Sequence, residues 1–227
     1  MSKKRVVRMG GDIREHPRYS ANEAAAILSI PQSTLHSWIY SNSAKHGPLI
    51  IPVDPGNGLL SFFNLVEAHV LVSTRRRNIP MSRVRIAVEY LREKVGGPHP
   101  LASYELATNA KSVFVRKLEG MTVDASRYGQ PALGDILDKY LRGIKRAKTD
   151  KMPIQIQPLT TGTLKLSPVV IDPYVSSGSP VIKGTGIVAK TVWKRAKGGE
   201  SLRDLARDYE LKLSEIETVI KYLDQAA

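Results

Sequence analysis

The stretch "YSANEAAAILSIPQSTLHSWI", residues 19–39, has the pattern of two short helices joined by a tight turn. Ser20 and Glu23 have the spacing of a capping box, in which each side chain satisfies a backbone amide at a helix start. Apolar residues then recur at helical spacing on both sides of Ser29-Ile30-Pro31, where the proline ends one helix and suits the first turn of the next. Residues 19–39 therefore predict a helix-turn-helix.

In a DNA-binding helix-turn-helix, the second helix enters the major groove with its N-terminal residues against base edges. The polar residues of the second helix can all donate or accept hydrogen bonds, and none of them is acidic. The residues expected to face bases are Gln32, Ser33, Thr34, His36 and Ser37. An ordinary corner between two helices is the alternative, but the capping box and the uncharged second helix favour DNA contact.

Residues 47–62 contain two apolar runs on either side of Asp54-Pro55-Gly56-Asn57-Gly58, a strong signal for a hairpin turn. A hairpin after a helix-turn-helix is expected to form a wing beside the DNA backbone. Basic residues near the wing and in the last turn of the following helix are candidates for phosphate contacts, although the arginines also suit a solvated helix end. These residues are Lys45, His46, Arg75, Arg76 and Arg77.

Two further helices are predicted after the wing. Residues 64–78 read as an amphipathic helix, and residues 79–97 read as a helix capped by Ser82. The expected apolar face of the first contains Leu65, Ala68, His69 and Val72.

The middle of the chain is expected to mix strands and a helix. Residues 105–126 have short β-prone runs that predict a small meander, and residues 131–148 predict a helix with one apolar stripe. Residues 152–159 and 163–171 alternate like strands.

The C-terminal part predicts three helices, one over 186–199 and two over 200–225. Capping boxes are expected from Ser201 to Asp204 and from Ser214 to Glu217. The last two helices resemble a second helix-turn-helix, but the polar side of the last one carries Glu215, Glu217 and Asp224. Since carboxylates repel phosphates, this unit is expected to contact protein rather than DNA.

Composition limits the classes of function. Lys and Arg total 34 against 21 Asp and Glu, so the net charge of +13 favours a polyanionic partner such as nucleic acid. The absence of cysteine excludes thiolate zinc sites and disulfides, the scattered histidines indicate no metal site, and no cofactor is expected. No long apolar run or signal peptide is found, so we expect a cytoplasmic protein without a membrane partner.

The stretch "GSPVIKGTG", residues 178–186, is close to a phosphate-binding loop, with Lys183 and Gly184 in exchanged order. Such a loop wraps phosphate with consecutive backbone amides, and Pro180 has none. The β-branched Val181 and Ile182 favour a short strand between two turns. A nucleotide-binding enzyme using this loop remains an alternative, but the expectation is that the chain is not an enzyme.

The expected fold is α+β and mostly α. It has a winged helix-turn-helix with its following helices over 1–98, a β-rich middle with a helix over 99–166, and a trihelical unit over 167–227.

Residues 171–222 resemble the small C-terminal domain of VapB-type antitoxins. The residues that carry the resemblance include Asp172, Pro173, Gly178, Pro180, Gly184 and Thr185. Gly186 and Val188 depart from the pattern, which has Arg and Pro there. Together with a MerR-like winged helix, the resemblance covers most of the chain.

The resemblance implies an antitoxin that neutralises a PIN-like ribonuclease toxin by protein contact and represses its own promoter. A homodimer is expected, because two-fold symmetry suits paired DNA half-sites. A stand-alone MerR-like regulator, with residues 99–152 sensing a ligand, is the alternative.

Overall fold

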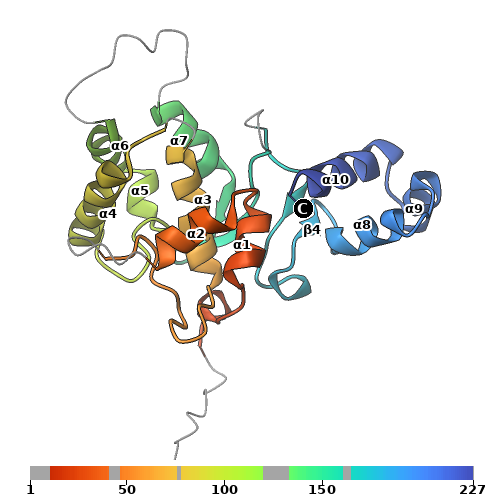
Figure 1. The fold of residues 1–227 in the computed structure, drawn as a ribbon, viewed down its shortest axis with the longest axis horizontal. Helices are drawn as coiled ribbons and strands as arrows, with labels where there is room; N and C mark the ends of the chain where they lie inside the picture. The colour runs from red at the N-terminus through yellow and green to blue at the C-terminus, as the bar shows by residue number, and fades with distance from the viewer. Residues whose placement is uncertain (1–10, 41–46, 76–77, 120–132, 161–164, 227) are drawn as a thin grey trace, which may run out of the picture.

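The computed structural model describes residues 11–40, 47–75, 78–119, 133–160 and 165–226 (Figure 1). Within these residues the fold is mostly helical with two small two-stranded sheets, so the predicted class is confirmed. One hydrophobic cluster contains residues from Tyr19 to Ile171, and a second contains residues from Val169 to Tyr222. Figure 1 shows the second cluster's helices beside the larger N-terminal body.

The predicted helix-turn-helix is formed by α1 (Ala21–Ile27) and α2 (Gln32–Ile39). The capping box at Ser20 is present in full. Ser29 adopts a φ of 51° in the turn between the helices. Leu35 and Trp38, on one face of α2, are almost completely buried, and this burial fixes which face of α2 points outward.

The predicted wing is reduced to a tight turn. Asp54 pairs with Leu59 in an isolated bridge, and the Asp54 Oδ1 atom accepts from the Asn57 amide. The first apolar run does not pair with the second, because the amides of Leu49 and Ile50 donate to the Trp38 carbonyl. The side chains of these two residues are buried, so the first apolar run packs in the hydrophobic core and does not form a β-strand of a hairpin.

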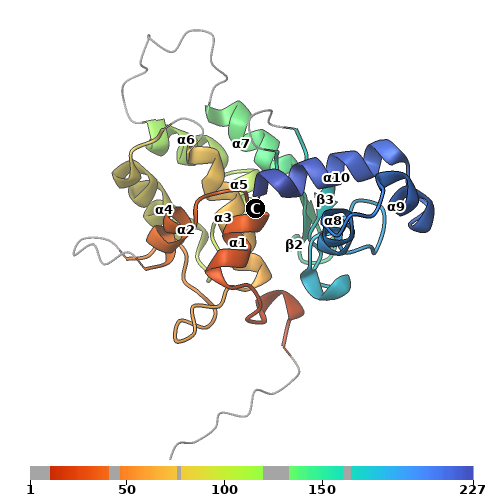
Figure 2. The same ribbon diagram turned by 45° about the vertical axis from the view of Figure 1, so that its right-hand side comes forward.

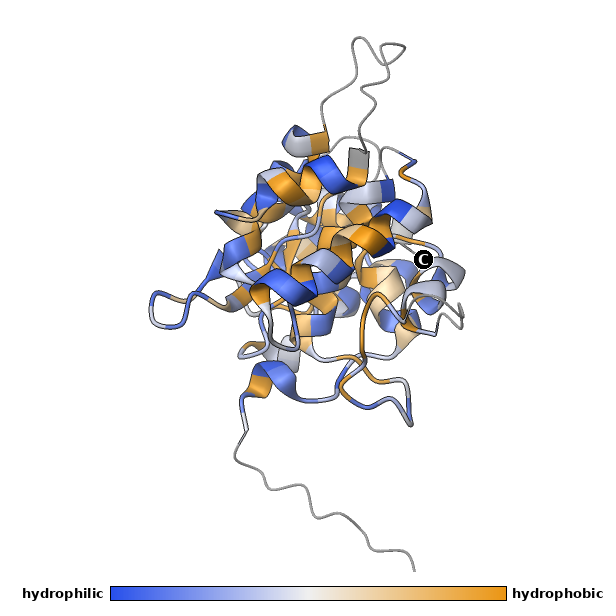
Figure 3. Cartoon of the chain, turned by 90° about the vertical axis from the view of Figure 1, so that its left-hand side faces the viewer, coloured by the Kyte–Doolittle hydropathy of each residue, from blue (hydrophilic) through white to orange (hydrophobic). Residues whose placement is uncertain are grey.

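The helix α3 (Phe62–Arg75) is buried on every side, from Phe62 to Thr74. The prediction of an amphipathic helix is therefore wrong. The helices and strands around it include α7 (Leu133–Arg142), η1 (Ile13–Glu15) and β2 (Pro153–Ile156). In Figure 3, hydrophobic residues gather along the inner helices, and hydrophilic residues occupy the outer faces.

The polar side chains of α3 are tolerated inside because they hydrogen-bond to the surrounding segments. Asn64 is fully buried, and its Oδ1 accepts from the amides of Val53 and Ser61, each at 3.1 Å. Its Nδ2 donates to the Ile51 carbonyl at 2.9 Å. Asn64 thus attaches both sides of the 54–58 turn to the central helix. Because its buried side-chain amide is hydrogen-bonded, its burial leaves no unsatisfied polar atom that would cost stability.

Two buried histidines connect α3 with other segments. The Nε2 of His69 donates to the Tyr140 carbonyl of α7 at 3.0 Å. His99 lies between two carboxylates, with Nδ1 3.1 Å from Glu67 Oε2 and Nε2 2.9 Å from Glu15 Oε2. Burial lowers the pKa of His69 to about 4. Burial by itself would lower the pKa of His99. The hydrogen bonds and negative charges of Glu67 and Glu15 have the larger effect together, and they hold the pKa of His99 above its ordinary value. Burial raises the pKa of Glu67.

The helices after α3 differ from the predictions in two places. The helix α4 spans Met81–Val95, and it begins directly after Pro80, so Ser82 lies inside the first turn and does not cap it. The predicted meander is wrong where the structure describes it, because α5 (Tyr104–Ala107) and α6 (Lys111–Glu119) occupy residues 104–119. The fully buried Phe114 and Leu118 are four residues apart on the same face of α6, which packs on α4. Residues 120–126 lie outside the described part.

The strands form two short antiparallel pairs. The strand β1 (Ile144–Arg146) pairs with β2, and β3 (Val169–Val170) pairs with β4 (Val181–Ile182). A bridge between Ile156 and Ile171 links the two pairs. In Figure 2, β2 and β3 lie between the N-terminal body and the C-terminal helices, where the chain passes from one core to the other.

The C-terminal unit contains α8 (Ala189–Lys197), α9 (Leu202–Asp208) and α10 (Leu213–Ala226) around the second cluster. Half of the capping box predicted at Ser201 is present, since its hydroxyl accepts from the Asp204 amide at 3.1 Å. The Asp204 carboxylate accepts from the Ser201 hydroxyl and not from its backbone amide. The box predicted from Ser214 to Glu217 is wrong. The helix starts two residues earlier than a cap at Ser214 implies, and the Lys212 amide donates to Glu215 Oε2 at 2.9 Å instead.

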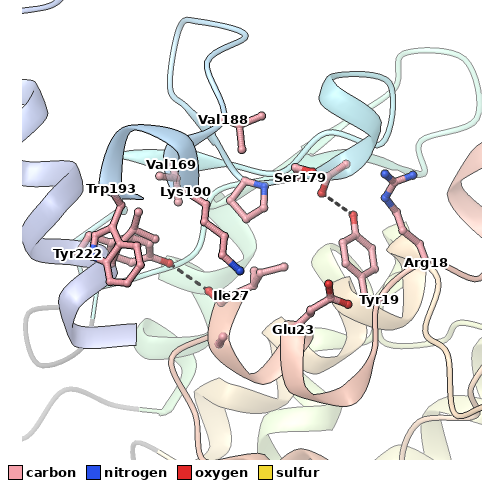
Figure 4. Close-up of a pocket in the computed structure, with 14 residues that line it drawn as sticks. Arg18, Tyr19, Glu23, Ile27, Val169, Ser179, Val188, Lys190, Trp193 and Tyr222 are labelled. Atoms are coloured by element: carbon pink, nitrogen blue, oxygen red, sulfur yellow. Dashed lines mark hydrogen bonds between the residues drawn. The ribbon is translucent and has the colours of Figure 1, made fainter. Parts of the chain in front are cut away.

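Two tyrosines hold the C-terminal unit against α1 (Figure 4). The Tyr19 hydroxyl donates to the Gly178 carbonyl at 2.9 Å, and the Tyr222 hydroxyl donates to the Ile27 carbonyl at 3.0 Å. Gly178 has a φ of 70°, and a Cβ there would lie 2.5 Å from Tyr19 Oη and 2.9 Å from Arg18 Nε. Only glycine permits this close approach.

Replacing Gly178 by Ala should destabilise the protein more than replacing Gly184 by Ala. Gly184 also has a positive φ, 83°, but a Cβ there would have open space around it. Both variants should lose about 1–2 kcal/mol to backbone strain, and Gly178→Ala should lose roughly a further 1–3 kcal/mol to the clash. Denaturant unfolding would measure both losses.

The background variant Tyr19→Phe provides the control for this clash, because it removes the hydroxyl that the new methyl group would meet. Within that background the difference between Gly178→Ala and Gly184→Ala should shrink, and the remaining difference should come from the contact with Arg18 Nε. An unchanged difference between the two glycine variants would contradict the close approach.

The two buried histidines should change stability with pH in opposite directions. The contribution of His99, whose folded pKa is raised, should be fully present below about pH 6.5 and lost as pH rises through the folded value. His69 stays neutral when folded, so its contribution should grow as pH rises towards about 6.5. The measurement is the free energy of unfolding of the wild type, His99→Gln and His69→Gln from about pH 5 to 9. Parallel curves for all three proteins would contradict this assignment.

Candidate functional site

The outward face of α2 carries polar side chains directly after the turn of the helix-turn-helix. Gln32, Ser33, His36 and Ser37 are exposed, as expected for residues that could meet base edges. The Ser37 hydroxyl donates to the Thr34 carbonyl at 2.7 Å and remains able to accept a further bond. No side chain caps the N-terminus of α2, so its first-turn amides add to a surface that suits an anion.

Thr34 departs from the expected face. It is only 8% exposed, and its hydroxyl accepts from Arg75 Nη1 at 2.8 Å. Thr34 lies four positions before the buried Trp38, on the same side of α2. It therefore connects α2 with the end of α3 and does not face outward with the other polar residues. Arg75 is exposed beyond this bond and keeps other N–H donors for a phosphate.

The remaining phosphate candidates, Lys45, His46, Arg76 and Arg77, lie outside the described residues. Two arginines of α4 support the segment that leads into the 54–58 turn. Arg85 Nη1 donates to the Gly47 carbonyl at 2.8 Å, and Arg92 Nη2 donates to the carbonyls of Pro48 and Leu49 at 2.7 and 2.9 Å.

Tyr40 belongs to the same surface and was missed by the sequence reasoning. It follows α2 directly, it is 43% exposed, and its ring lies 4.5 Å from the ring of His36 between centroids. Its hydroxyl packs against Gly58, so the end of α2 and the tight turn lie next to each other. An aromatic residue immediately after the predicted recognition helix was the signal available in the sequence.

The 178–186 loop cannot cradle a phosphate in the way a nucleotide-binding loop does. Five of its backbone amides already donate to carbonyls of the protein, so these five are not free to surround an anion. The amides engaged in this way belong to Gly178, Ser179, Ile182, Lys183 and Thr185. As the sequence predicted, Val181 and Ile182 form a strand between two turns.

The residues that carry the antitoxin resemblance build the path from β3 into α8. Asp172 Oδ1 accepts from the Tyr174 amide at 2.9 Å in the turn that begins at Asp172-Pro173. The Pro180 carbonyl accepts from the Ala189 amide at 3.0 Å, and Thr185 Oγ1 accepts from the Ile187 amide at 3.0 Å. These residues therefore shape the backbone of the C-terminal unit.

The two positions that depart from the family pattern are accommodated by backbone bonds. The Gly186 carbonyl accepts from the Ser176 hydroxyl at 3.0 Å. Val188 forms a bridge with Val181 immediately before α8 begins.

Several charges on the C-terminal unit are paired within it. Arg195 bonds to Glu200 and Asp208, and Lys197 lies 2.8 Å from Asp224. Asp224 is thus not a free acidic group, contrary to expectation. Glu215 is held at the start of α10, and among the described residues Glu217 has no ion-pair partner. The negative surface of α10 is therefore limited to its N-terminal turns.

Within the described ranges, no helix is both long and apolar enough to span a membrane.

Two sequence families match separate parts of the chain. The sequence family described as "Putative DNA-binding HTH domain" matches residues 17–88, which include α1, α2 and α3. The family described as "Protein of unknown function (DUF433)" matches residues 169–223, which form the C-terminal unit.

Two curated relatives and one solved structure, all from Mycobacterium tuberculosis, resemble nearly the whole chain. The protein named "Putative antitoxin VapB45" is 30% identical over 215 residues, which are 85% of this chain and 88% of the relative. The uncharacterized protein Rv2308 is also 30% identical, over 90% of this chain and 89% of its own length. The crystal structure of Rv2018 has a TM-score of 0.69 at 29% identity and covers 90% of this chain and 98% of its own.

Identity at this level over most of both chains, together with an N-terminal helix-turn-helix and a C-terminal trihelical unit, leads to one conclusion. The chain belongs to the family of VapB-type antitoxins that includes VapB45.

Proposed function

We propose that this antitoxin binds its own promoter DNA through the exposed face of α2 and neutralises a PIN-like ribonuclease toxin by protein contact. The observation that carries the DNA-binding part is the polar surface of α2. Its exposed side chains are held by a buried opposite face that contains Leu35 and Trp38. The overall charge of +13 supports a polyanionic partner.

In this proposal the bases are contacted by Gln32, Ser33, His36 and Ser37. Glutamine can form two hydrogen bonds to adenine, and serine and histidine can bond to several base edges. Arg75 reaches a phosphate, as do Lys45, His46, Arg76 and Arg77. Phosphate contacts set the position on the duplex, and base contacts set the sequence preference.

The proposed assembly on DNA is a homodimer. A short recognition helix of eight residues can contact only a few base pairs, so a single copy would bind with low specificity. Two copies related by a two-fold axis would place two α2 helices in successive major grooves of a palindromic operator.

The toxin is proposed to bind the C-terminal unit. This unit has its own core, and the exposed Glu215 and Glu217 place two negative charges on the first turns of α10, where they disfavour contact with DNA. A partner with a basic patch would complement this surface, and its on-rate would fall as salt rises.

Replacing Gln32 and His36 by Ala should weaken binding to the promoter fragment about tenfold or more, since two base contacts are lost. The thermal midpoint should stay close to that of the wild type, because both side chains are exposed. Thr34→Ala should instead lower the midpoint, because it breaks the buried bond to Arg75. Fluorescence anisotropy with labelled promoter DNA would measure the affinities.

The matched control for this experiment is Lys221→Ala, an exposed substitution on α10. It should leave DNA affinity within a factor of about two. If the Gln32 and His36 variant binds the promoter as well as the wild type does, α2 is not the recognition helix.

Replacing Glu217 by Lys should weaken the complex with the product of the neighbouring toxin gene about tenfold or more through charge repulsion. Glu215→Gln is a second variant with a smaller expected effect. It removes the charge, but the glutamine oxygen can still accept from the Lys212 amide. Growth rescue on co-expression and co-purification would measure neutralisation. Unchanged DNA binding would show that the variants are folded, and full rescue by Glu217→Lys would place the toxin elsewhere.

A further inference from the structure

We propose that the cleft between α1 and the C-terminal unit is a binding site for a small amphipathic anion, such as an aromatic or medium-chain carboxylate. This inference goes beyond the proposed contacts with DNA and toxin and does not depend on them. The cleft is formed where the two cores meet, and it has a volume of about 490 Å³ (Figure 4). Pockets that hold small molecules have volumes in this range.

Two hydrogen bonds join the walls of the cleft and fix their positions relative to each other. The Tyr222 bond to the Ile27 carbonyl lies on one side of Lys190, and the Tyr19 bond to the Gly178 carbonyl lies on the other (Figure 4). Both hydroxyls belong to buried tyrosines, and burial raises the pKa of each to about 12. The hydroxyls therefore remain protonated donors at neutral pH, and the cleft is preformed.

Apolar side chains supply most of the lining. They come from both units, and they are Ile27, Val169, Pro180, Val188, Trp193 and Leu223. The indole N–H of Trp193 donates to Asp224 Oδ1 at 2.8 Å, which fixes the ring at the edge of the cleft. Such a lining would receive an aromatic ring or an alkyl chain and gain free energy from its burial.

The charges of the cleft favour an anionic group on the ligand. Lys190 is exposed and projects into the cleft between the two tyrosine bonds, and it has no ion-pair partner among the described residues (Figure 4). Arg18, at the Gly178 side, also has no ion-pair partner in the described ranges. A ligand cation would be repelled by both of these side chains, whereas an anion would pair with Lys190.

Glu23 is the one carboxylate of the cleft, and it is already engaged. Its Oε2 accepts from the backbone amide and the hydroxyl of Ser20, at 2.9 and 2.8 Å. These bonds hold the pKa of Glu23 below its ordinary value, with smaller contributions from Lys190 and Arg18. Glu23 therefore serves the cap of α1, and the remaining positive charge is available to a ligand.

Three probes of similar size and different charge test the site with the full-length protein. They are 4-phenylbutyrate, 4-phenyl-1-butanol and 4-phenylbutylamine. We expect phenylbutyrate to bind about two- to fivefold more tightly than the alcohol, because the ion pair with Lys190 adds to the apolar contact. The amine should bind most weakly. Calorimetry would measure the affinities.

The chain has two tryptophans, and this allows the site to be located. Trp193 lines the cleft, whereas Trp38 is 1% exposed in the N-terminal core. In a nitrogen-15 spectrum of labelled indoles, phenylbutyrate should shift the Trp193 signal and leave the Trp38 signal in place. The variant Trp193→Phe would assign the two signals.

Substitutions distinguish binding in the cleft from a general attraction of the anionic probe to the positively charged protein. Lys190→Gln should reduce phenylbutyrate affinity about two- to fivefold. Ala26 on α1 also lines the cleft, and Ala26→Phe should block it. Lys194→Gln, an exposed change of the same kind on α8 that does not line the cleft, should have no effect. An unshifted Trp193 signal at about 5 mM phenylbutyrate, equal binding of the alcohol, or unchanged affinity in Lys190→Gln would each overturn the proposal.

Discussion

The N-terminal body depends on the burial of α3 on every side. A helix with 13 buried residues must be covered all round by other elements, and its polar side chains must find partners inside the protein. Asn64 bonds to the segment around the tight turn, Glu67 to His99, and His69 to the backbone of α7. Each bond attaches a different part of the chain to α3. The position of α2 follows from the same arrangement, because Arg75 at the end of α3 bonds to Thr34.

Local signals in the sequence were sufficient for the elements whose ends are set locally. The capping box at Ser20, the break before Pro31 and the cap at Ser201 each involve residues within a few positions, and all are present. The local signals gave wrong predictions where contacts between residues far apart in the sequence determine burial or secondary structure. The asparagine and glutamate of α3 look like a solvent-facing side until their partners are known, whereas His69 was expected on the buried face and lies there. Residues 111–119 are β-prone by composition, but packing against α4 makes them a helix.

The candidate site shows the same limit. Exposure of Gln32, Ser33, His36 and Ser37 could be predicted, because the apolar residues of α2 define the opposite face. The burial of Thr34 could not, since its partner is 41 residues away. The reason for glycine at 178 was equally out of reach. Glycine is required there because the backbone contacts Tyr19, which is 159 residues away in the sequence and belongs to the other unit.

The way α2 is attached to the body has a consequence for how relatives can diverge. Among the described contacts, the side chains of Gln32 and Ser33 take no part in the fold, so substitutions there can accumulate without loss of stability. Thr34, between these positions and His36, is constrained by its bond to Arg75. If α2 contacts DNA as proposed, its sequence preference can change in steps at a few neighbouring positions while the scaffold that carries the helix stays the same.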